Sequence, residues 1–301
     1  MGRASTLYKW RFNWKSDSYY CYIEQQKVEE FAQWILNIGD GKMSSDDEEE
    51  MIKIPSDLLL QKGDDPREAI VKSTYPDLLN NYQQRKFLEE RAILCPWNET
   101  VDQINEYIMS QIKGEEVTYL SCDSVCAATT KGMEHMYTKE FLNTLRFPGM
   151  PNHELKLKVG LPVMLLRNIN QSAGLCNGTR MTITQLGKRC IEAQIITGTH
   201  VGDKVYIPRI IMSPNDTKWP FKLKRRQYPL SVCFAMTINK SQGQSLNKVG
   251  LYLSKQVFCH GQLYVALSRV TNRNGLKVLI DESENQAEDM AKNIVYKEIF
   301  Q

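Results

Sequence analysis

The spacing of apolar residues along this chain changes twice, and each change predicts a different kind of structure. In residues 26–38 apolar side chains recur every three or four positions on one face of a helix, and Gly39 would end that helix. The face consists of Val28, Phe31, Ala32, Ile35 and Leu36. Residues 91–95 read as a short buried strand that Pro96 breaks. Asn98 would then cap a helix, and a strand running into a capped helix opens a βα unit.

The middle of the chain has a different pattern, with short β-rich runs separated by Gly and Asn. Strands at a spacing of about 8–12 residues with turns between them are typical of a small β-barrel or sandwich. The expected strands are 154–158, 162–167, 180–186, 190–196 and 204–207. Two earlier elements are a strand at 117–121 and a short helix capped by Thr138.

After residue 228 the alternation of strands and helices returns. Strands are expected at 231–236, 248–253 and 276–280, and helices at 258–268 and 284–299. We therefore predict an α/β fold, a parallel sheet with flanking helices, interrupted by an inserted β-domain.

Composition adds few constraints. Apolar residues make up 42% and charged residues 24%, as in ordinary globular proteins, and no apolar run is long enough for a membrane span. The eight cysteines are scattered and the four histidines have no ligand spacing, so we expect reduced thiols and no metal site. Residues 44–50 form an acidic run that should be a solvated loop.

Charge is unevenly placed along the chain. Residues 151–230 hold 13 Lys or Arg against 4 Asp or Glu, a net charge of +9, and the remainder holds 25 against 31, a net charge of −6. A basic middle indicates a local anionic partner, although a solvated basic surface explains the charge equally well.

Two segments near the end carry candidate chemistry. Thr237-Ile-Asn-Lys-Ser-Gln-Gly243 follows a β-rich run and places polar donors beside a glycine, which favours contact with phosphates. Gln262–Arg269 looks helical and ends in an arginine that could bind a transferring phosphoryl group or cap its own helix. The phosphate-binding pattern G-x-x-x-x-G-K-[ST] is absent from the 301 residues. Lys277–Glu282 resembles a Walker B strand, but a core strand ending in solvated acids is the better interpretation.

Together, these segments resemble the last two motifs of the Pif-type, RecD-like branch of superfamily-one DNA helicases, which includes the Helitron-transposon helicases. Residues 91–105 are similar to motif IV of that family, and 153–168 and 174–180 to its small β-barrel insertion. The resemblance covers roughly residues 26–282. The lobe that carries the Walker A and B motifs in this family has no counterpart in the 301 residues. It implies a second RecA-like P-loop-NTPase lobe at 91–150 and 228–301. It also implies an SH-three-like barrel at 151–227 and, at 1–90, a remnant or linker from the first lobe.

The resemblance also implies roles for individual residues. Arg269 would be the arginine finger, with Gln242 in the catalytic apparatus, and Gly243 and Ser268 would couple DNA contact to the nucleotide. DNA contacts would come from Thr237, Asn239, Lys240, Ser241, Asn98, Lys156, Lys158, Arg167 and Arg180. The family usually has His where Asn239 stands and Thr where Trp97 stands; Trp97 could instead stack on a base.

The resemblance implies the C-terminal part of an ATP-dependent 5′-to-3′ DNA helicase, in repair, recombination, telomere maintenance or transposition. ATP and Mg²⁺ belong to the complete family enzyme, and neither is expected to bind tightly to this chain alone, which we predict to be inactive by itself. The expected partners are single-stranded DNA and a first RecA-like lobe, separate or encoded upstream. The expected location is nuclear, with mitochondrial or cytoplasmic as alternatives. The other hypotheses are a non-catalytic nucleic-acid-binding remnant and an unstable truncated product.

Overall fold

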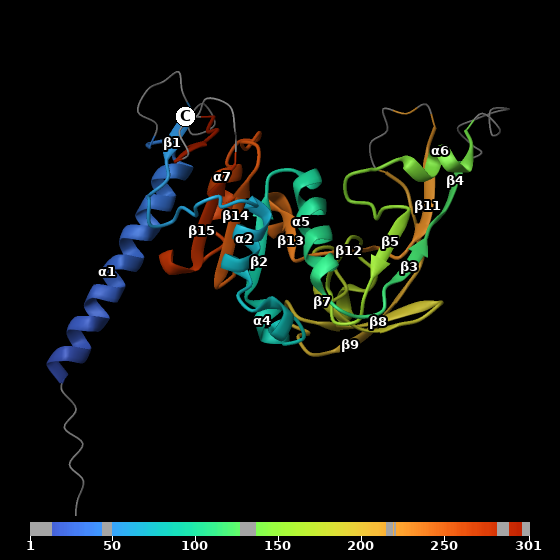
Figure 1. Cartoon of the computed structure of the whole chain (residues 1–301), viewed down its shortest axis with the longest axis horizontal. Helices are drawn as coiled ribbons and strands as arrows, with labels where there is room; N and C mark the ends of the chain where they lie inside the picture. Colours follow the sequence, from blue (N-terminus) through green and yellow to red (C-terminus); the bar gives the residue numbers. More distant parts are fainter. Residues whose placement is uncertain are drawn as a thin grey trace, which may run out of the picture.

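The computed structural model describes residues 14–43, 50–126, 137–214, 219, 221–281 and 289–296, with side chains from residue 25 onward. Figure 1 shows a parallel sheet with helices beside it, a long helix α1 (Trp14–Gly39) at one end and a region of antiparallel strands at the other. No helix in these residues is long and apolar enough to cross a membrane.

The parallel sheet has the strand order β13-β2-β14-β15. Its strands are β13 (Ala235–Thr237), β2 (Arg91–Cys95), β14 (Lys248–Leu253) and β15 (Leu276–Ile280), and each neighbouring pair runs parallel. Their apolar runs are nearly continuous because helices cover both faces. One face packs on α2 (Pro66–Thr74) and α5 (Asn98–Gln111), and the other on α1 and α7 (Gln262–Leu267). The predicted strand–helix alternation is confirmed for these elements.

Helix α1 is longer than the predicted 26–38, and only part of the predicted face is buried. Phe31, Ile35 and Ile38 are buried, whereas Val28 and Leu36 are about half exposed. The helix ends at Gly39, as predicted. A Cβ on Gly39 would lie 2.8 Å from the ring of Tyr264 in α7, so the glycine also permits the close approach of the two helices.

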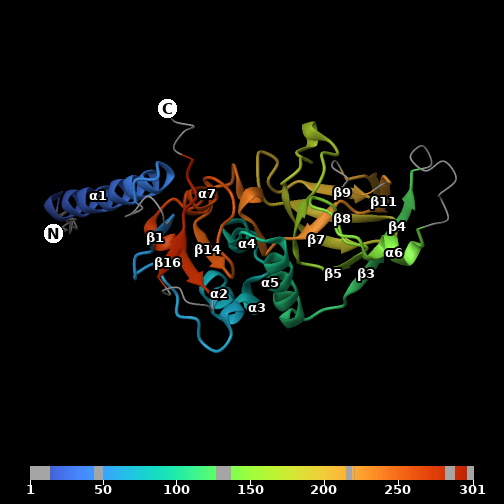
Figure 2. The ribbon, with the colours of Figure 1, turned by 90° about the horizontal axis from the view of Figure 1, so that it is seen from above.

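The antiparallel region contains three sheets. A five-stranded sheet has the order β12-β6-β7-β8-β9, a three-stranded sheet β10-β11-β4 and a two-stranded sheet β3-β5. The strands are β3 (Val117–Leu120), β4 (Cys122–Val125), β5 (Glu154–Leu157), β6 (Pro162–Leu165), β7 (Arg180–Leu186), β8 (Cys190–Ile195), β9 (Lys204–Pro208), β10 (Ile210–Met212), β11 (Leu223–Gln227) and β12 (Leu230–Val232). The predicted middle strands are thus confirmed, while the SH-three-like barrel stays a prediction. Figure 2 shows these strands grouped on the side of α5 away from α1.

Strand pairing assigns some segments differently from the predicted domain ranges. β3 pairs with β5, and β4 with β11, so residues 117–125 belong to the antiparallel region although we expected them in the 91–150 lobe. Helix α6 (Lys139–Thr144), which Thr138 caps as predicted, packs beside β4. Within 1–90, the expected remnant, α2 packs directly on β14. Two short helices, α3 (Leu78–Asn81) and α4 (Arg85–Glu89), lead into β2.

The predicted closing helix at 284–299 is wrong where the structure describes it. Residues Met290–Lys292 form strand β16, which pairs antiparallel with β1 (Met51–Lys53). Residues 282–288 and 297–301 lie outside the described residues, as does most of the predicted acidic loop 44–50. Glu50, its last residue, lies 3.3 Å from the ammonium of Lys292.

A buried ion pair holds the far end of the antiparallel region. The guanidinium of Arg225 in β11 lies 2.6 Å from a carboxylate oxygen of Asp123 in β4, and both side chains are fully buried. The same guanidinium donates to the backbone carbonyls of Leu142, Leu145 and Pro151. All these contacts converge on one cation, so they tie β4, β11 and α6 together.

Removing the carboxylate should therefore destabilise the fold strongly. We expect Asp123→Ala to lower the free energy of unfolding by about 3–5 kcal/mol, because it leaves Arg225 charged, buried and without its anion. Urea denaturation measures this. The control is Asp203→Ala, whose largely exposed side chain pairs only with His200 and should cost under about 0.5 kcal/mol. Equal effects of the two changes would contradict a central role for the buried pair.

Candidate nucleic-acid interface

The candidate site lies at the carboxyl edge of the parallel sheet. β13 ends at Thr237 and β2 at Cys95, and these two residues are partners in the parallel register. Ligands of open α/β sheets bind outside the carboxyl ends of the strands. After β2 the chain enters α5, and after β13 it forms the short 3-10 helix η3 (Ile238–Ser241). The 91–105 segment, which is similar to motif IV, and the Thr237–Gly243 segment therefore meet at one edge.

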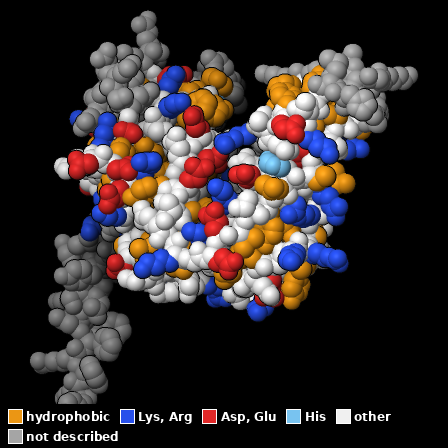
Figure 3. Space-filling view, turned by 45° about the vertical axis from the view of Figure 1, so that its right-hand side comes forward, with side chains coloured by type: hydrophobic (Ala, Val, Ile, Leu, Met, Phe, Trp, Pro, Cys, Tyr) orange, Lys and Arg blue, Asp and Glu red, His pale blue; other side chains and the backbone are white. Residues whose placement is uncertain are grey.

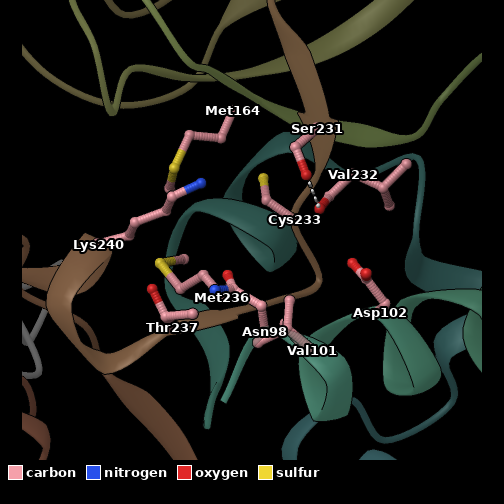
Figure 4. A pocket seen from close by; sticks show the side chains of 11 residues that line it. Asn98, Val101, Asp102, Met164, Ser231, Val232, Cys233, Met236, Thr237 and Lys240 are labelled. Carbon is pink, nitrogen blue, oxygen red and sulfur yellow. Dashed lines mark hydrogen bonds between the residues drawn. The ribbon is translucent and has the colours of Figure 1, made fainter. Parts of the chain in front are cut away.

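A small pocket of about 40 Å³ opens between this edge and the antiparallel region. Its polar lining includes Asn98 and Asp102 from α5, Thr237 from β13 and Lys240 from η3, and Met164 of β6 and Ser231 of β12 close it from the other side. In Figure 4 the Lys240 side chain extends toward Met164 and Cys233. A space of this size holds a few waters or one small polar group, and is too small for a nucleoside.

Lys240 is the most distinctive residue in the pocket. It is half-buried, and no hydrogen bond or ion pair joins its ammonium to the described residues. Burial lowers the pKa of this ammonium, Cys233 and Asp102 act in the opposite direction, and the charge of Arg167 lowers it further. A partly desolvated cation without a counter-ion is energetically unfavourable, and a bound anion would compensate its charge.

Asp102 is the acid nearest to this cation in the pocket lining. Burial raises the pKa of its carboxyl group, against the lowering effect of Arg146, whose guanidinium lies 3.4 Å away. Sequence reasoning missed Asp102. The signal was available, because Asp102 stands four residues after Asn98 and so shares its face of the helix. The prediction that Asn98 caps α5 is wrong, because Trp97 is the N-cap residue and Asn98 is the first helical residue.

The turn after η3 divides the predicted contact residues into two kinds. Asn239 and Gln242 are exposed, while Ser241 is fully buried and its hydroxyl donates to the carbonyl of Ile238 at 2.7 Å. Ser241 therefore stabilises the turn and cannot reach DNA in this structure. Gly243 follows with φ +77, a left-handed conformation that favours glycine.

Arg269 connects the two predicted motifs in space. Its Nε donates to the carbonyl of Val265 at 2.9 Å, one Nη donates to Ser268 Oγ at 2.8 Å, and the other reaches the carbonyl of Gln244. The backbone N–H of Leu246 donates to the Arg269 carbonyl at 2.8 Å. The guanidinium thus caps the end of its own helix, the alternative that the sequence left open, and also contacts the residue after Gly243.

The four basic residues predicted in the insertion separate clearly. Lys156 is exposed on β5, and Arg167 is partly exposed after β6 and acts electrostatically on Lys240. Lys158 is buried, and its ammonium donates to the carbonyls of Met109 and Ile112 at the end of α5. Arg180 is fully buried and donates to the carbonyls of Leu88, Glu89 and Arg91. The predicted DNA contacts of Lys158 and Arg180 are therefore corrected to internal hydrogen bonds.

Among the described residues, no group of three His, Cys, Asp or Glu side chains is arranged to hold a metal ion. Basic side chains gather on the surface of the antiparallel region in Figure 3. Lys224 and Arg226 are exposed on β11, and the exposed Lys222 directly precedes that strand.

Comparison with known proteins shows which helicases this chain is similar to. Residues 140–186 match the family model described as the DNA helicase Pif1 2B domain, and residues 218–299 match a model described as helicase. The chain is 33% identical over 195 residues to the ATP-dependent DNA helicase PIF1 of Xenopus laevis, covering 62% of this chain and 27% of that protein. It is a relative of the Pif1 helicases. A Bdellovibrio bacteriovorus Pif1 is 27% identical over 228 residues, covering 75% of this chain and 48% of that protein.

Solved Pif1 structures share the fold of this Pif1 relative. The Candida albicans Pif1 helicase superposes with a TM-score of 0.56 at 22% identity, covering 90% of this chain and 56% of that one. A Bacteroides Pif1 helicase in complex with ADP-AlF3 and ssDNA gives 0.55 at 19% identity, covering 90% and 52%. This supports a RecA-like α/β fold. The chain spans about a quarter to a half of the length of the curated relatives described above.

Substitution of Lys158 and of Lys240 should affect the free energy of unfolding differently. Lys158→Met leaves two helix-end carbonyls without donors, so we expect a loss of about 1–3 kcal/mol in the free energy of unfolding. Lys240→Met removes an unpaired cation whose lowered folded-state pKa penalises the charged form, so stability should be unchanged or slightly higher at neutral pH. That difference should shrink as pH rises through the lowered pKa of Lys240. Urea denaturation between neutral and alkaline pH checks both, and a large loss with Lys240→Met would refute the assignment.

Proposed function

We propose that this chain is the part of an ATP-dependent 5′-to-3′ DNA helicase that contacts single-stranded DNA and carries the arginine finger. The observation that carries the proposal is the unpaired, half-buried ammonium of Lys240 at the carboxyl edge of the parallel sheet. A DNA phosphate is the anion that would complete it. Thr237 and Asn98 line the same pocket and offer a hydroxyl and an amide to that phosphate.

The pocket is too small for a base and large enough for part of a phosphate, which supports backbone contact rather than sequence readout. Asn239 and Gln242 extend the polar surface from the exposed side of the turn. Lys156 and Arg167 would hold the strand or the duplex beyond it, and in this proposal the antiparallel region is an SH-three-like barrel.

Arg269 would serve the nucleotide side. Its guanidinium is held through Ser268 and Gln244, one residue from Gly243, so a movement of the DNA-contacting turn would reach it directly. We do not expect these residues to form an ATP–Mg²⁺ site by themselves, because the 301 residues contain no G-x-x-x-x-G-K-[ST] pattern. The phosphate cradle would come from a first RecA-like lobe, and no chemical step is assigned to this chain alone.

A non-catalytic nucleic-acid-binding protein is the second candidate function, and the unpaired ammonium of Lys240 supports it as well as the first. This second function also requires Lys240 for DNA binding, but it does not require Arg269. The two proposals therefore differ only in whether Arg269 matters when a complementary lobe is supplied.

Lys240→Met should weaken binding of a fluorescent oligothymidylate by about tenfold at low salt, because one desolvated phosphate contact is lost. The slope of log affinity against log salt should fall by roughly 0.7, as for one phosphate contact on a single strand. Affinity of the unsubstituted protein should decline as pH rises through the lowered pKa of Lys240, and the variant should lack this decline. Fluorescence anisotropy measures all three. Lys72→Met, on the exposed surface of α2, is the matched control; equal affinities of the two variants would sink the proposal.

The 301-residue polypeptide should not hydrolyse ATP, with or without single-stranded DNA, because a guanidinium without a phosphate cradle supplies little of the needed charge stabilisation. A first RecA-like lobe from a Pif1 relative, fused upstream, should restore hydrolysis that Arg269→Ala abolishes. Phosphate release reports both. Hydrolysis by the unfused chain that disappears on Arg269→Ala would overturn this prediction, and restored hydrolysis that ignores Arg269→Ala would rule out the finger.

A further inference from the structure

An exposed aromatic pair lies on the same edge of the sheet as the pocket. The rings of Trp97 and Phe258 are 4.3 Å apart between centroids, inclined at 40°. Trp97 is the N-cap residue of α5, after β2, and Phe258 lies in the loop between β14 and α7. Their side chains remain 37% and 45% exposed, although they are two of the largest apolar groups on the surface.

The pair is held in place rather than loosely displayed. The indole N–H of Trp97 donates to the carbonyl of Gln256 at 3.2 Å, and the backbone N–H of Phe258 donates to the side-chain oxygen of Gln262 in α7 at 3.0 Å. The hydroxyls of Thr100 and Ser254 join the same two segments at 2.7 Å. Fixed rings lose little conformational entropy when a flat ligand stacks on them.

One side of the pair carries Lys255, whose ammonium also lies 3.7 Å from a carboxylate oxygen of Glu99, and the other side continues into the pocket. The ammonium of Lys255 lies 6.0 Å from the centroid of the Trp97 ring. Asn98, the next residue after Trp97, lines the pocket that contains Lys240. A ligand that places an anion at Lys240 and a flat apolar group on Trp97 would therefore cross a single continuous edge. Single-stranded DNA has both parts in every nucleotide.

We propose that Trp97 and Phe258 form a stacking platform for a nucleobase of the single strand whose backbone lies at the Lys240 pocket. This rests on the proposed function. A base stacks on an aromatic face irrespective of its identity, so the platform would add affinity without sequence preference. Because Phe258 lies just before α7, a base stacked on its ring would also contact the segment that leads into the helix before Arg269.

The test compares two ligands of equal length, an oligothymidylate and the corresponding abasic oligonucleotide, which has the same phosphates and no bases. Trp97→Leu and Phe258→Leu keep apolar bulk and remove the aromatic face. We expect Trp97→Leu to weaken oligothymidylate binding at least fivefold and to leave abasic binding within twofold. Phe258→Leu should show the same pattern. Trp219→Leu, another exposed tryptophan, in the antiparallel region, is the matched control and should change neither.

Lys240→Met distinguishes the stacking platform from the phosphate contact proposed above. This substitution should weaken binding of both the oligothymidylate and the abasic oligonucleotide. Equal loss on both ligands with Trp97→Leu would overturn the platform and assign Trp97 to local structure. If Trp97→Leu changed the affinity for neither oligonucleotide, the platform would also be overturned. The aromatic pair would then be assigned to contact with another protein lobe. A thymidylate-only effect of Trp97→Leu together with no effect of Lys240→Met would keep the platform and refute the phosphate site.

Discussion

The hydrogen bonds of the buried Arg180 guanidinium fix the junction on which the rest of this structure depends. Arg180 begins β7 in the antiparallel region, and its side chain crosses to the carbonyls of Leu88, Glu89 and Arg91, where the chain enters β2 of the parallel sheet. A buried guanidinium requires acceptors, and these carbonyls supply them to its two terminal nitrogens, whereas its Nε has no partner among the described residues.

Neighbouring contacts hold the returning chain at the same junction. The Tyr75 hydroxyl donates to the carbonyl of Phe234 at 2.8 Å, and the Asn105 amide bonds the backbone of Val232 and Ala235. The pocket lies directly beside this crossing, between β12, β13 and α5. The pocket therefore lies against the junction, and no hydrogen bond or ion pair joins the Lys240 ammonium to the described residues there.

The local sequence pattern predicted most strands of this fold. Runs such as Arg91–Cys95 and Arg180–Leu186 are short, rich in apolar and β-branched residues, and typical of strands. Pairing partners were not predictable. Val117–Leu120 reads the same in a parallel and an antiparallel sheet, and only its contact with β5 decides. The buried face of α1 was partly misassigned, because Val28 and Leu36 continue the apolar spacing but remain about half exposed.

The site was predictable as far as the motifs extend. Thr237, Asn239, Lys240 and Asn98 lie at one edge, as their order in two motifs implied. Charge counting failed for Lys158, Arg180 and Arg225, because a sequence shows that a cation is present and not whether carbonyls enclose it. Three of the 13 basic residues that suggested a DNA-binding surface are internal structural groups. The remaining case for DNA therefore rests on Lys240 and its edge rather than on total charge.

The central claim is that single-stranded DNA lies along the carboxyl edge of the parallel sheet. Photo-crosslinking of an oligonucleotide containing 4-thiothymidine, followed by mass spectrometry of the attached peptides, tests it most directly. The account predicts crosslinks in the segments that contain Trp97–Asn98 and Thr237–Gly243. Crosslinks confined to the exposed side of β11, around Lys222–Arg226, with none at this edge, would contradict it.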